Sequence, residues 1–250
     1  MIAGTNSGCG KTTVTCAVLQ ALVNRKINVS SFKCGPDYID PMFHKTVIGT
    51  AAYNLDTYLM SNDAVNYLLN KNSGDIAVVE GVMGFYDGFS FTEKGSTHEL
   101  SEITDTDVIL VVNCRGMSLS AMALVKGFKE FRKNNIKGVI FNNLSEKLYG
   151  NLSEECRKIG LVPLGFLPNI KDVQISSRHL GLVTAGEIDG IKDKMNLLAD
   201  YAEKYIDIDK ILEISENNSD TKFTSPEITK KYNVKIAVAY DRAFCFYYED

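Results

Sequence analysis

The residues with the clearest chemistry stand at the start of the chain. Glycines and small residues run from Gly4 to Gly10, and Lys11 and two threonines follow them. Such a turn lets consecutive backbone N–H groups point at phosphate oxygens, and the positive end of the next helix adds to the attraction. A nucleoside triphosphate would bind here, with Lys11 on its outer phosphates and Thr12 on Mg²⁺. The predicted nucleotide contacts are Thr5, Asn6, Ser7, Gly8, Cys9, Gly10, Lys11, Thr12 and Thr13.

This loop departs from the strict spacing G-x-x-x-x-G-K-[ST]. Counting back from Gly10, the first position of the pattern falls on Thr5, and the glycine lies one residue earlier at Gly4. The departure points away from Ras-like and adenylate-kinase-like loops, and the loop resembles that of dethiobiotin synthetase. A glycine-rich turn without function is the alternative, but a strand before the loop and a helix after it favour a phosphate site.

Acidic residues follow two of the predicted strands. Asp37 and Asp40 come after the strand at 27–34, while Glu80 closes a buried apolar run and Asp87 lies seven residues further on. The carboxyl ends of parallel strands form the ligand crevice of an open sheet, so we expect all four acids around the phosphates. For Asp37 and Asp40, simple turn chemistry beside proline is the competing interpretation.

Glu80 is the strongest candidate for a magnesium ligand, because an acid at the end of the strand beside a phosphate loop commonly meets the metal. The predicted metal ligands are Thr12, Glu80 and Asp37; a helix cap is the alternative role for Glu80. Lys33 would touch a phosphate or a substrate carboxylate, unless it is a surface lysine. Asn142 follows a later strand and would read the nucleotide base or cap a loop.

Strands and helices alternate along the first two hundred residues. This pattern predicts an α/β fold with a doubly wound, mostly parallel sheet, of the P-loop NTPase type. The predicted strands are 2–3, 27–34, 76–79, 107–112, 136–141 and 162–167. The predicted helices are 14–23, 64–70, 98–103, 119–131, 154–159 and 188–205, and 208–214 either continues the last one or forms a short helix of its own.

The chain divides into three parts by composition. Residues 1–214 would form the ATP-dependent domain, and the polar stretch 215–233 is typical of a linker. Residues 234–250 predict a new strand at 234–239 and a short helix at 244–248. A strand and half a helix cannot bury a core. We therefore expect this end to be the start of a truncated second domain.

Composition excludes several classes of protein. The net charge of −4 argues against a nucleic-acid binder, and no apolar run approaches the roughly 20 residues that span a membrane. The amino terminus has no signal pattern, so we expect a cytoplasmic protein. The six cysteines form no C-x-x-C pair and the three histidines are scattered, which leaves no zinc motif. The oligomeric state stays open, a homodimer included.

Five segments in order resemble the cobyrinate a,c-diamide synthase family: GTNSGCGKTT, KCGPDYIDPMFH, EGVMGFYDG, SSRHLGLV and IAVAYDRAFCFYY. The resemblance implies an ATP-dependent synthetase domain similar to dethiobiotin synthetase, followed by a glutamine amidotransferase-like domain. It also implies amidation of the a and c acetate groups of cobyrinate, with ammonia from glutamine. Because this chain stops early in the second domain, we expect it to use free ammonia.

The resemblance also assigns roles to individual residues. It implies that Lys11, Thr12 and Glu80 hold ATP and Mg²⁺. The residues it places in catalysis are Asp37, Asp40, Asp87 and Lys33. Those it places at the tetrapyrrole polycarboxylate are Tyr38, Ile39, Ser177 and Arg178, of which the arginine suits bidentate carboxylate binding. A packed loop is the competing role for Ser177 and Arg178.

Two other functions fit part of the sequence. Ni-sirohydrochlorin a,c-diamide synthase shares the same motifs and chemistry on a different macrocycle. A ParA- or MinD-like switch ATPase shares the phosphate loop, but those proteins carry a signature lysine where this chain has Thr5. The membrane-binding members also need a basic amphipathic tail, whereas this chain ends in FCFYYED.

Overall fold

The computed structural model describes residues 1–170, 185–216, 233–241 and 244–248. The strands are β1 (Ile2–Gly4), β2 (Val29–Cys34), β3 (Ala51–Leu55), β4 (Ile76–Glu80), β5 (Val108–Asn113), β6 (Ile136–Asn142) and β7 (Val162–Leu167). The helices are α1 (Lys11–Asn24), α2 (Ile39–Phe43), the π-helix η1 (His44–Ile48), α3 (Asn62–Asn72), α4 (Thr97–Ile103), α5 (Ser120–Phe131), α6 (Glu146–Lys158), α7 (Ala185–Tyr205) and α8 (Ile208–Glu216).

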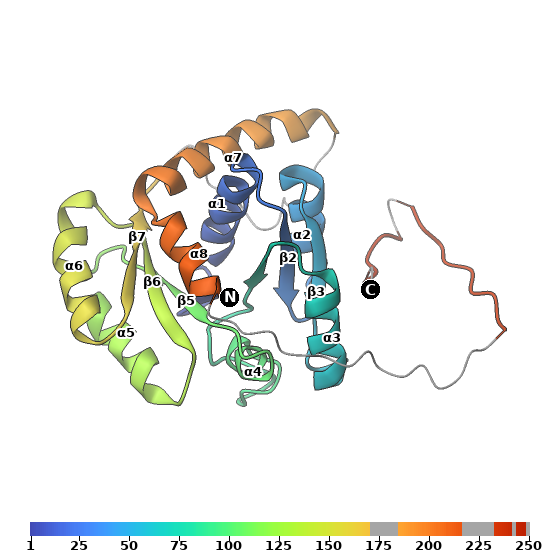
Figure 1. Cartoon of the computed structure of the whole chain (residues 1–250), viewed down its shortest axis with the longest axis horizontal. Coiled ribbons are helices and arrows are strands. Elements are labelled where there is room, and N and C mark those ends of the chain that lie inside the picture. Colours follow the sequence, from blue (N-terminus) through green and yellow to red (C-terminus); the bar gives the residue numbers. More distant parts are fainter. Residues whose placement is uncertain (171–184, 217–232, 242–243, 249–250) are drawn as a thin grey trace.

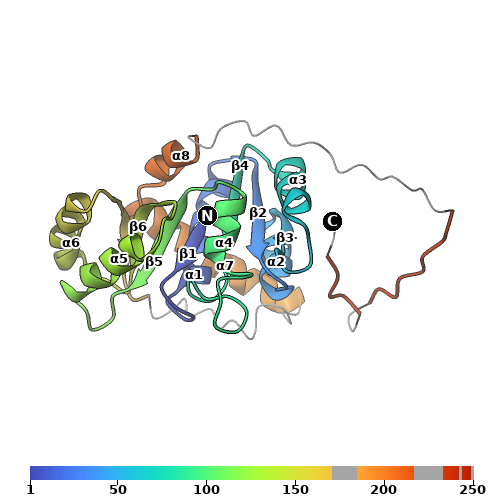
Figure 2. The same ribbon diagram turned by 90° about the horizontal axis from the view of Figure 1, so that it is seen from below.

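The seven strands form one sheet in the order β3-β2-β4-β1-β5-β6-β7. Every neighbouring pair of strands is parallel. The short strand β1 lies in the middle, between β4 and β5, and the phosphate loop leaves from its carboxyl end (Figures 1 and 2). The strand order reverses direction around β1, which is where an open α/β sheet forms its ligand crevice.

Helices cover both faces of the sheet. Along β5 the side chains of Ile109 and Val111 face the core that contains α1, α7 and α8, whereas Leu110 and Val112 face the core that contains α3 to α6. Successive side chains of a strand point to opposite faces, so a strand buried on both sides must be apolar throughout. This arrangement confirms the predicted doubly wound, parallel α/β fold.

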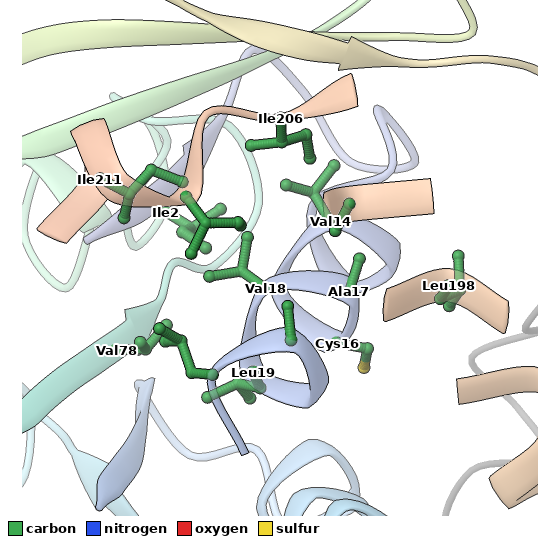
Figure 3. Packing of buried hydrophobic residues seen from close by; sticks show 14 of the residues in the cluster. Ile2, Val14, Cys16, Ala17, Val18, Leu19, Val78, Leu198, Ile206 and Ile211 are labelled. Atoms are coloured by element: carbon green, nitrogen blue, oxygen red, sulfur yellow. The ribbon is translucent and has the colours of Figure 1, made fainter. Parts of the chain in front are cut away.

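Helix α1 is buried on nearly all sides, between the sheet and α7. Val14, Val18 and Leu19 are fully buried, and Figure 3 shows them between Ile2 of β1 and Leu198 of α7. A helix that is apolar all round is stable only inside the protein. The sheet and α7 therefore fix the helix whose amino terminus carries Lys11 and Thr12.

The structure corrects several predicted elements. Strand β3 and helix α2 were not expected, since the stretch that includes α2 was interpreted as a loop. Helix α6 begins at Glu146, eight residues before the predicted helix at 154–159. Helix α3 begins at Asn62, two residues before the predicted helix at 64–70, because the Ser61 side chain accepts a hydrogen bond from the N–H of Ala64 and caps it.

The expected strand at 234–239 and helix at 244–248 are both wrong. Residues 233–240 form no regular element, and Figure 1 shows them as an extended trace apart from the sheet. Val234, Ile236 and Val238 are exposed. A strand needs a neighbouring strand for its backbone hydrogen bonds, and none lies beside this one in the described residues. Among the described helices, none is long and apolar enough to cross a membrane.

Candidate nucleotide and carboxylate site

The loop between β1 and α1 has the backbone of a phosphate cradle. Gly8 and Gly10 have φ values of 78° and 97°, in the region that favours glycine. Residues 6 to 8 are exposed, whereas the Cys9 side chain is buried beneath them. Because residues 6 to 8 are exposed and Cys9 anchors the loop in the core, the loop can surround an anion at the amino terminus of α1.

Asn142 supports this loop from the end of β6. Its side-chain amide is buried and donates a hydrogen bond of 2.9 Å to the carbonyl oxygen of Cys9. The same amide nitrogen lies 1.9 Å from where a Cβ atom on Gly10 would be, so only glycine fits there. This geometry favours the loop-capping role of Asn142 over the reading of a nucleotide base.

Lys11 is tied to the loop that follows β4. Its Nζ donates to the carbonyl oxygen of Met83 at 2.8 Å, and the Phe85 N–H donates to the Gly4 carbonyl at 2.8 Å. Met83 itself has a φ of 43°, which is unusual for a residue with a side chain. The EGVMG segment therefore lies directly against the phosphate loop, as expected from the sheet order.

Glu80 connects the phosphate loop to the acidic cluster, which consists of Asp37 and Asp40 around Lys33. Its Oε1 accepts hydrogen bonds from the Thr12 hydroxyl at 2.6 Å and from Lys33 Nζ at 3.1 Å. Its other oxygen, Oε2, is buried and accepts no hydrogen bond from the described residues. His44 Nε2 lies 3.6 Å from it and also has no hydrogen-bond partner in the described chain. The side chain is completely buried, so this is an unusual environment for a carboxylate.

The residues around Glu80 fit a magnesium ion that arrives with a nucleotide. Within the described chain, no three His, Cys, Asp or Glu side chains are grouped to hold a metal by themselves. Mg²⁺ bound to a triphosphate needs only one or two protein ligands, since phosphates and water supply the rest. The bonded pair Thr12 and Glu80, with an unpartnered carboxylate oxygen, meets that requirement.

Lys33 is a buried cation among three carboxylates. Its Nζ lies 2.6 Å from Asp40 Oδ2 and 3.6 Å from Asp37 Oδ2, in addition to its bond with Glu80. Burial lowers the pKa of Lys33, but the charges of Glu80, Asp40 and Asp37 raise it more, and the net shift is upward. Lys33 thus stays protonated and can neutralise negative charge, but it cannot act as a base.

His44 belongs to this cluster but was not among the predicted site residues, although it ends the segment KCGPDYIDPMFH. It is buried, and its Nδ1 lies 3.2 Å from the Ser31 hydroxyl. Burial lowers the pKa of His44 to about 4, with Asp40 raising it and Lys33 lowering it. The neutral ring therefore packs against Glu80. Its position four residues after Asp40, across the junction of α2 and η1, is a further sequence signal.

Asp37 has a structural role as well as a charge. Its Oδ1 accepts hydrogen bonds from the N–H groups of Ile39 and Asp40, which holds the start of α2. Asn54 of β3 supports the same turn through its amide, which donates to the carbonyl oxygens of Gly35 and Asp37 at 2.9 and 2.8 Å. Asn54 was missed because β3 itself was not predicted.

The remaining predicted site residues lie in different surroundings, and two of them are not described by the structure. Tyr38 stacks on Tyr248, with ring centroids 5.2 Å apart, whereas Ile39 is half-buried and packs against the core that contains α1. Asp87 accepts a hydrogen bond from the N–H of Gly84 at 3.1 Å, so its described contact shapes the loop after β4. Ser177 and Arg178 lie outside the described residues.

These features define a class: a parallel α/β nucleotide-binding domain with its phosphate loop on the central strand. Residues 1–183 match the family model described as "CobQ/CobB/MinD/ParA nucleotide binding domain". The chain belongs to this family.

Within this family, the chain is similar to cobyrinate a,c-diamide synthases over its whole length. The chain is 43% identical to cobyrinate a,c-diamide synthase of Thermoplasma volcanium, over 100% of this chain and 56% of that protein. It is 41% identical to the synthases of Clostridium acetobutylicum and Methanocaldococcus jannaschii, over 100% of this chain and 58% of each. The chain thus spans little more than half the length of these relatives.

Solved structures agree with the fold. The MinD cell division protein of Aquifex aeolicus aligns with a TM-score of 0.50 at 15% identity, over 86% of this chain and 93% of that chain. The septum site-determining protein MinD of Pyrococcus horikoshii, solved with Mg-ADP, aligns with a TM-score of 0.50 at 17% identity, over 86% and 97%. At such identities the likeness concerns the fold alone.

Proposed function

We propose that this chain is the ATP-dependent synthetase part of a cobyrinate a,c-diamide synthase, acting in the cytoplasm on the a and c acetate groups of cobyrinate. The observation that carries the proposal is the chain of contacts from Thr12 through Glu80 to Lys33 and Asp40. It joins a phosphate loop to a buried set of charges. The similarity to cobyrinate a,c-diamide synthases over the whole chain supports the same function.

The chemistry requires activation of a carboxylate, because oxide is not a viable leaving group. A carboxylate oxygen of the substrate attacks the γ-phosphorus of ATP, the bond to the ADP oxygen breaks, and an acyl phosphate forms. Ammonia then attacks the acyl carbon, loses a proton to solvent and expels inorganic phosphate. Transfer of a phosphoryl group depends mainly on positioning and on the neutralisation of charge.

The residues of the chain supply both requirements. The backbone N–H groups between Gly8 and Lys11 would surround the β- and γ-phosphates, and Lys11 would exchange its bond with the Met83 carbonyl for one with a phosphate. Bound Mg²⁺ would neutralise charge between these phosphates, held by Thr12 and Glu80. Lys33, kept protonated by its acidic neighbours, would hold the positions of Asp40 and Asp37.

The test is product formation by the 250-residue chain. We expect inorganic phosphate and cobyrinate amides with ATP, Mg²⁺, cobyrinate and ammonium, and no amide when glutamine replaces ammonium. Ni-sirohydrochlorin and succinate serve as competing carboxylates, and Lys11→Ala as the inactive control. Phosphate release that ignores all carboxylates would refute the proposal and favour a switch ATPase. Turnover with Ni-sirohydrochlorin alone would assign the other macrocycle.

A further inference from the structure

A cavity of about 450 Å³ lies beside the nucleotide loop, among the segments that follow β2, β3 and β4. None of the predicted catalytic or nucleotide-binding residues lines it. Its volume falls within the range of about 300–1,000 Å³ that is usual for small-molecule sites.

The walls of this cavity are apolar and open to solvent. The lining residues Tyr58, Leu59 and Phe89 are 58%, 65% and 65% exposed, and Met83 is 40% exposed. The rings of Tyr58 and Phe89 lie 5.8 Å apart, between centroids. Large apolar side chains grouped around one cavity and exposed to water are costly unless a ligand covers them.

The cavity adjoins the nucleotide site through shared and neighbouring residues. Met83, which lines it, accepts the hydrogen bond of Lys11 through its carbonyl oxygen. Pro36, which also lines it, is the residue before Asp37. A flat molecule held by these walls would therefore have one edge beside the outer phosphates and the acidic cluster, where a carboxylate must lie to be phosphorylated.

The charges at the cavity favour an anionic ligand. Lys94 lines it with Nζ 5.7 Å from the Tyr58 ring centroid, and no described carboxylate forms an ion pair with it. The acid in the lining, Asp56, is already occupied: its Oδ1 accepts from the N–H groups of Tyr58 and Leu59, and its Oδ2 accepts from the Tyr248 hydroxyl. Lys94 is thus free to bind a carboxylate of a ligand.

We propose that this cavity binds the face of the tetrapyrrole macrocycle, with Tyr58, Leu59 and Phe89 against its ring and Lys94 on a peripheral carboxylate. The inference rests on the proposed function and adds a site for the part of the substrate that does not react. The aromatic and aliphatic walls select a large flat ring, while Lys94 favours one that carries several acids. A small aliphatic acid would gain little from them.

The experiment is a calorimetric titration of the full chain with cobyrinate in the absence of ATP. We expect Leu59→Ala and Phe89→Ala each to raise the Kd for cobyrinate about tenfold, since each removes apolar contact with the ring. Lys94→Ala should raise it to a similar extent, and less at high salt, because a surface charge is screened. Leu119, which is 63% exposed and does not line the cavity, gives the matched control Leu119→Ala, with unchanged Kd.

Two results would overturn the inference. The first would contradict only the proposed macrocycle site, and the second would contradict the proposed function as well. If wild-type chain binds cobyrinate and the Leu59, Phe89 and Lys94 variants bind it equally well, the cavity is not the macrocycle site and the proposed function stands. If cobyrinate does not bind to the wild-type chain at all, both proposals fail. ATP binding, measured in parallel, should be the same in every variant because none of these residues belongs to the phosphate loop.

Discussion

Glu80 links the phosphate loop to the buried charges behind it. It joins Thr12 of the phosphate loop to Lys33 of the acidic cluster, and its second oxygen accepts no hydrogen bond from the described residues. A buried carboxylate in such surroundings is stable only with its cationic and hydroxyl partners in place. The same property suits a ligand for a metal that comes and goes with the nucleotide.

Replacing Glu80 by glutamine should separate nucleotide binding from turnover. The amide keeps the size of the side chain but removes the charge that Mg²⁺ needs, so we expect ATP binding within about threefold of wild type and a loss of at least about a hundredfold in turnover. Fluorescence titration with an ATP analogue and phosphate release measure the two effects. Glu130→Gln, at an exposed position on α5, is the control with unchanged turnover. Full activity of Glu80→Gln would exclude the metal role.

His44 makes the stability of this cluster depend on pH. Its pKa in the fold is about 4, against an ordinary value near 6.5, so the unfolded chain binds a proton more readily than the fold does. The stability contributed by the neutral ring is present above pH 6.5 and is lost as the pH falls towards 4. From pH 7 to pH 5 this loss amounts to about 2 kcal/mol for the single group.

Urea unfolding at pH 7 and pH 5 tests this directly. We expect the free energy of unfolding of His44→Gln to fall by about 2 kcal/mol less than that of wild type over the interval, because glutamine does not titrate. The comparison cancels the acids that titrate in both proteins. Equal losses in the two proteins would mean that the histidine is already protonated in the fold, paired with Glu80.

At the scale of elements, the packing of helix α1 between the sheet and α7 determines the position of the site. The amino terminus of α1 carries Lys11, and α7 packs along the side of α1 that faces away from the sheet (Figure 3). Leu198 of α7 is fully buried in this contact, whereas its neighbour Leu197 is 38% exposed. The two leucines are adjacent in the sequence, but one lies in the core and the other is partly exposed to solvent.

This pair gives a matched prediction for packing. Leu198→Ala should lower the free energy of unfolding by about 2–5 kcal/mol, as expected for a truncated core leucine, while Leu197→Ala should lower it by less than about 1 kcal/mol. Urea unfolding at pH 7 measures both. Similar costs for the two would show that α7 does not cover α1 as described.

The sequence predicted this part of the molecule well, for a physical reason. Strands such as β5 are buried on both faces and therefore read as continuous apolar runs, and the glycines of the phosphate loop have few alternative roles. Strand β3, at the sheet edge, has an exposed first residue and the polar Asn54 within it, so no such run appears. His44 and Asn54 join the site through η1 and β3, neither of which was predicted.

At the scale of the whole molecule, residues 1–216 of the described chain already form a sheet with both faces covered. The relatives are longer, since the chain spans 56% to 58% of their length. The segment 233–248 adds no described element to the sheet. Its described contacts with the rest include the bond from the Tyr248 hydroxyl to the buried Asp56 and the packing of Phe246 and Tyr248 on Tyr38.

Removing this segment should therefore leave the fold intact. We expect deletion of 233–250 to lower the free energy of unfolding by about 2–4 kcal/mol, the value of the hydrogen bond to Asp56 and the two ring contacts of Tyr38. Deletion of 208–250 should cost several kcal/mol more, because it also removes the buried Ile208, Ile211 and Ile214 of α8, each worth about 1.5–3 kcal/mol. Urea unfolding of the two shortened chains makes the comparison. If both deletions cost the same, the last residues are part of the core, and the division of the molecule after α8 is wrong.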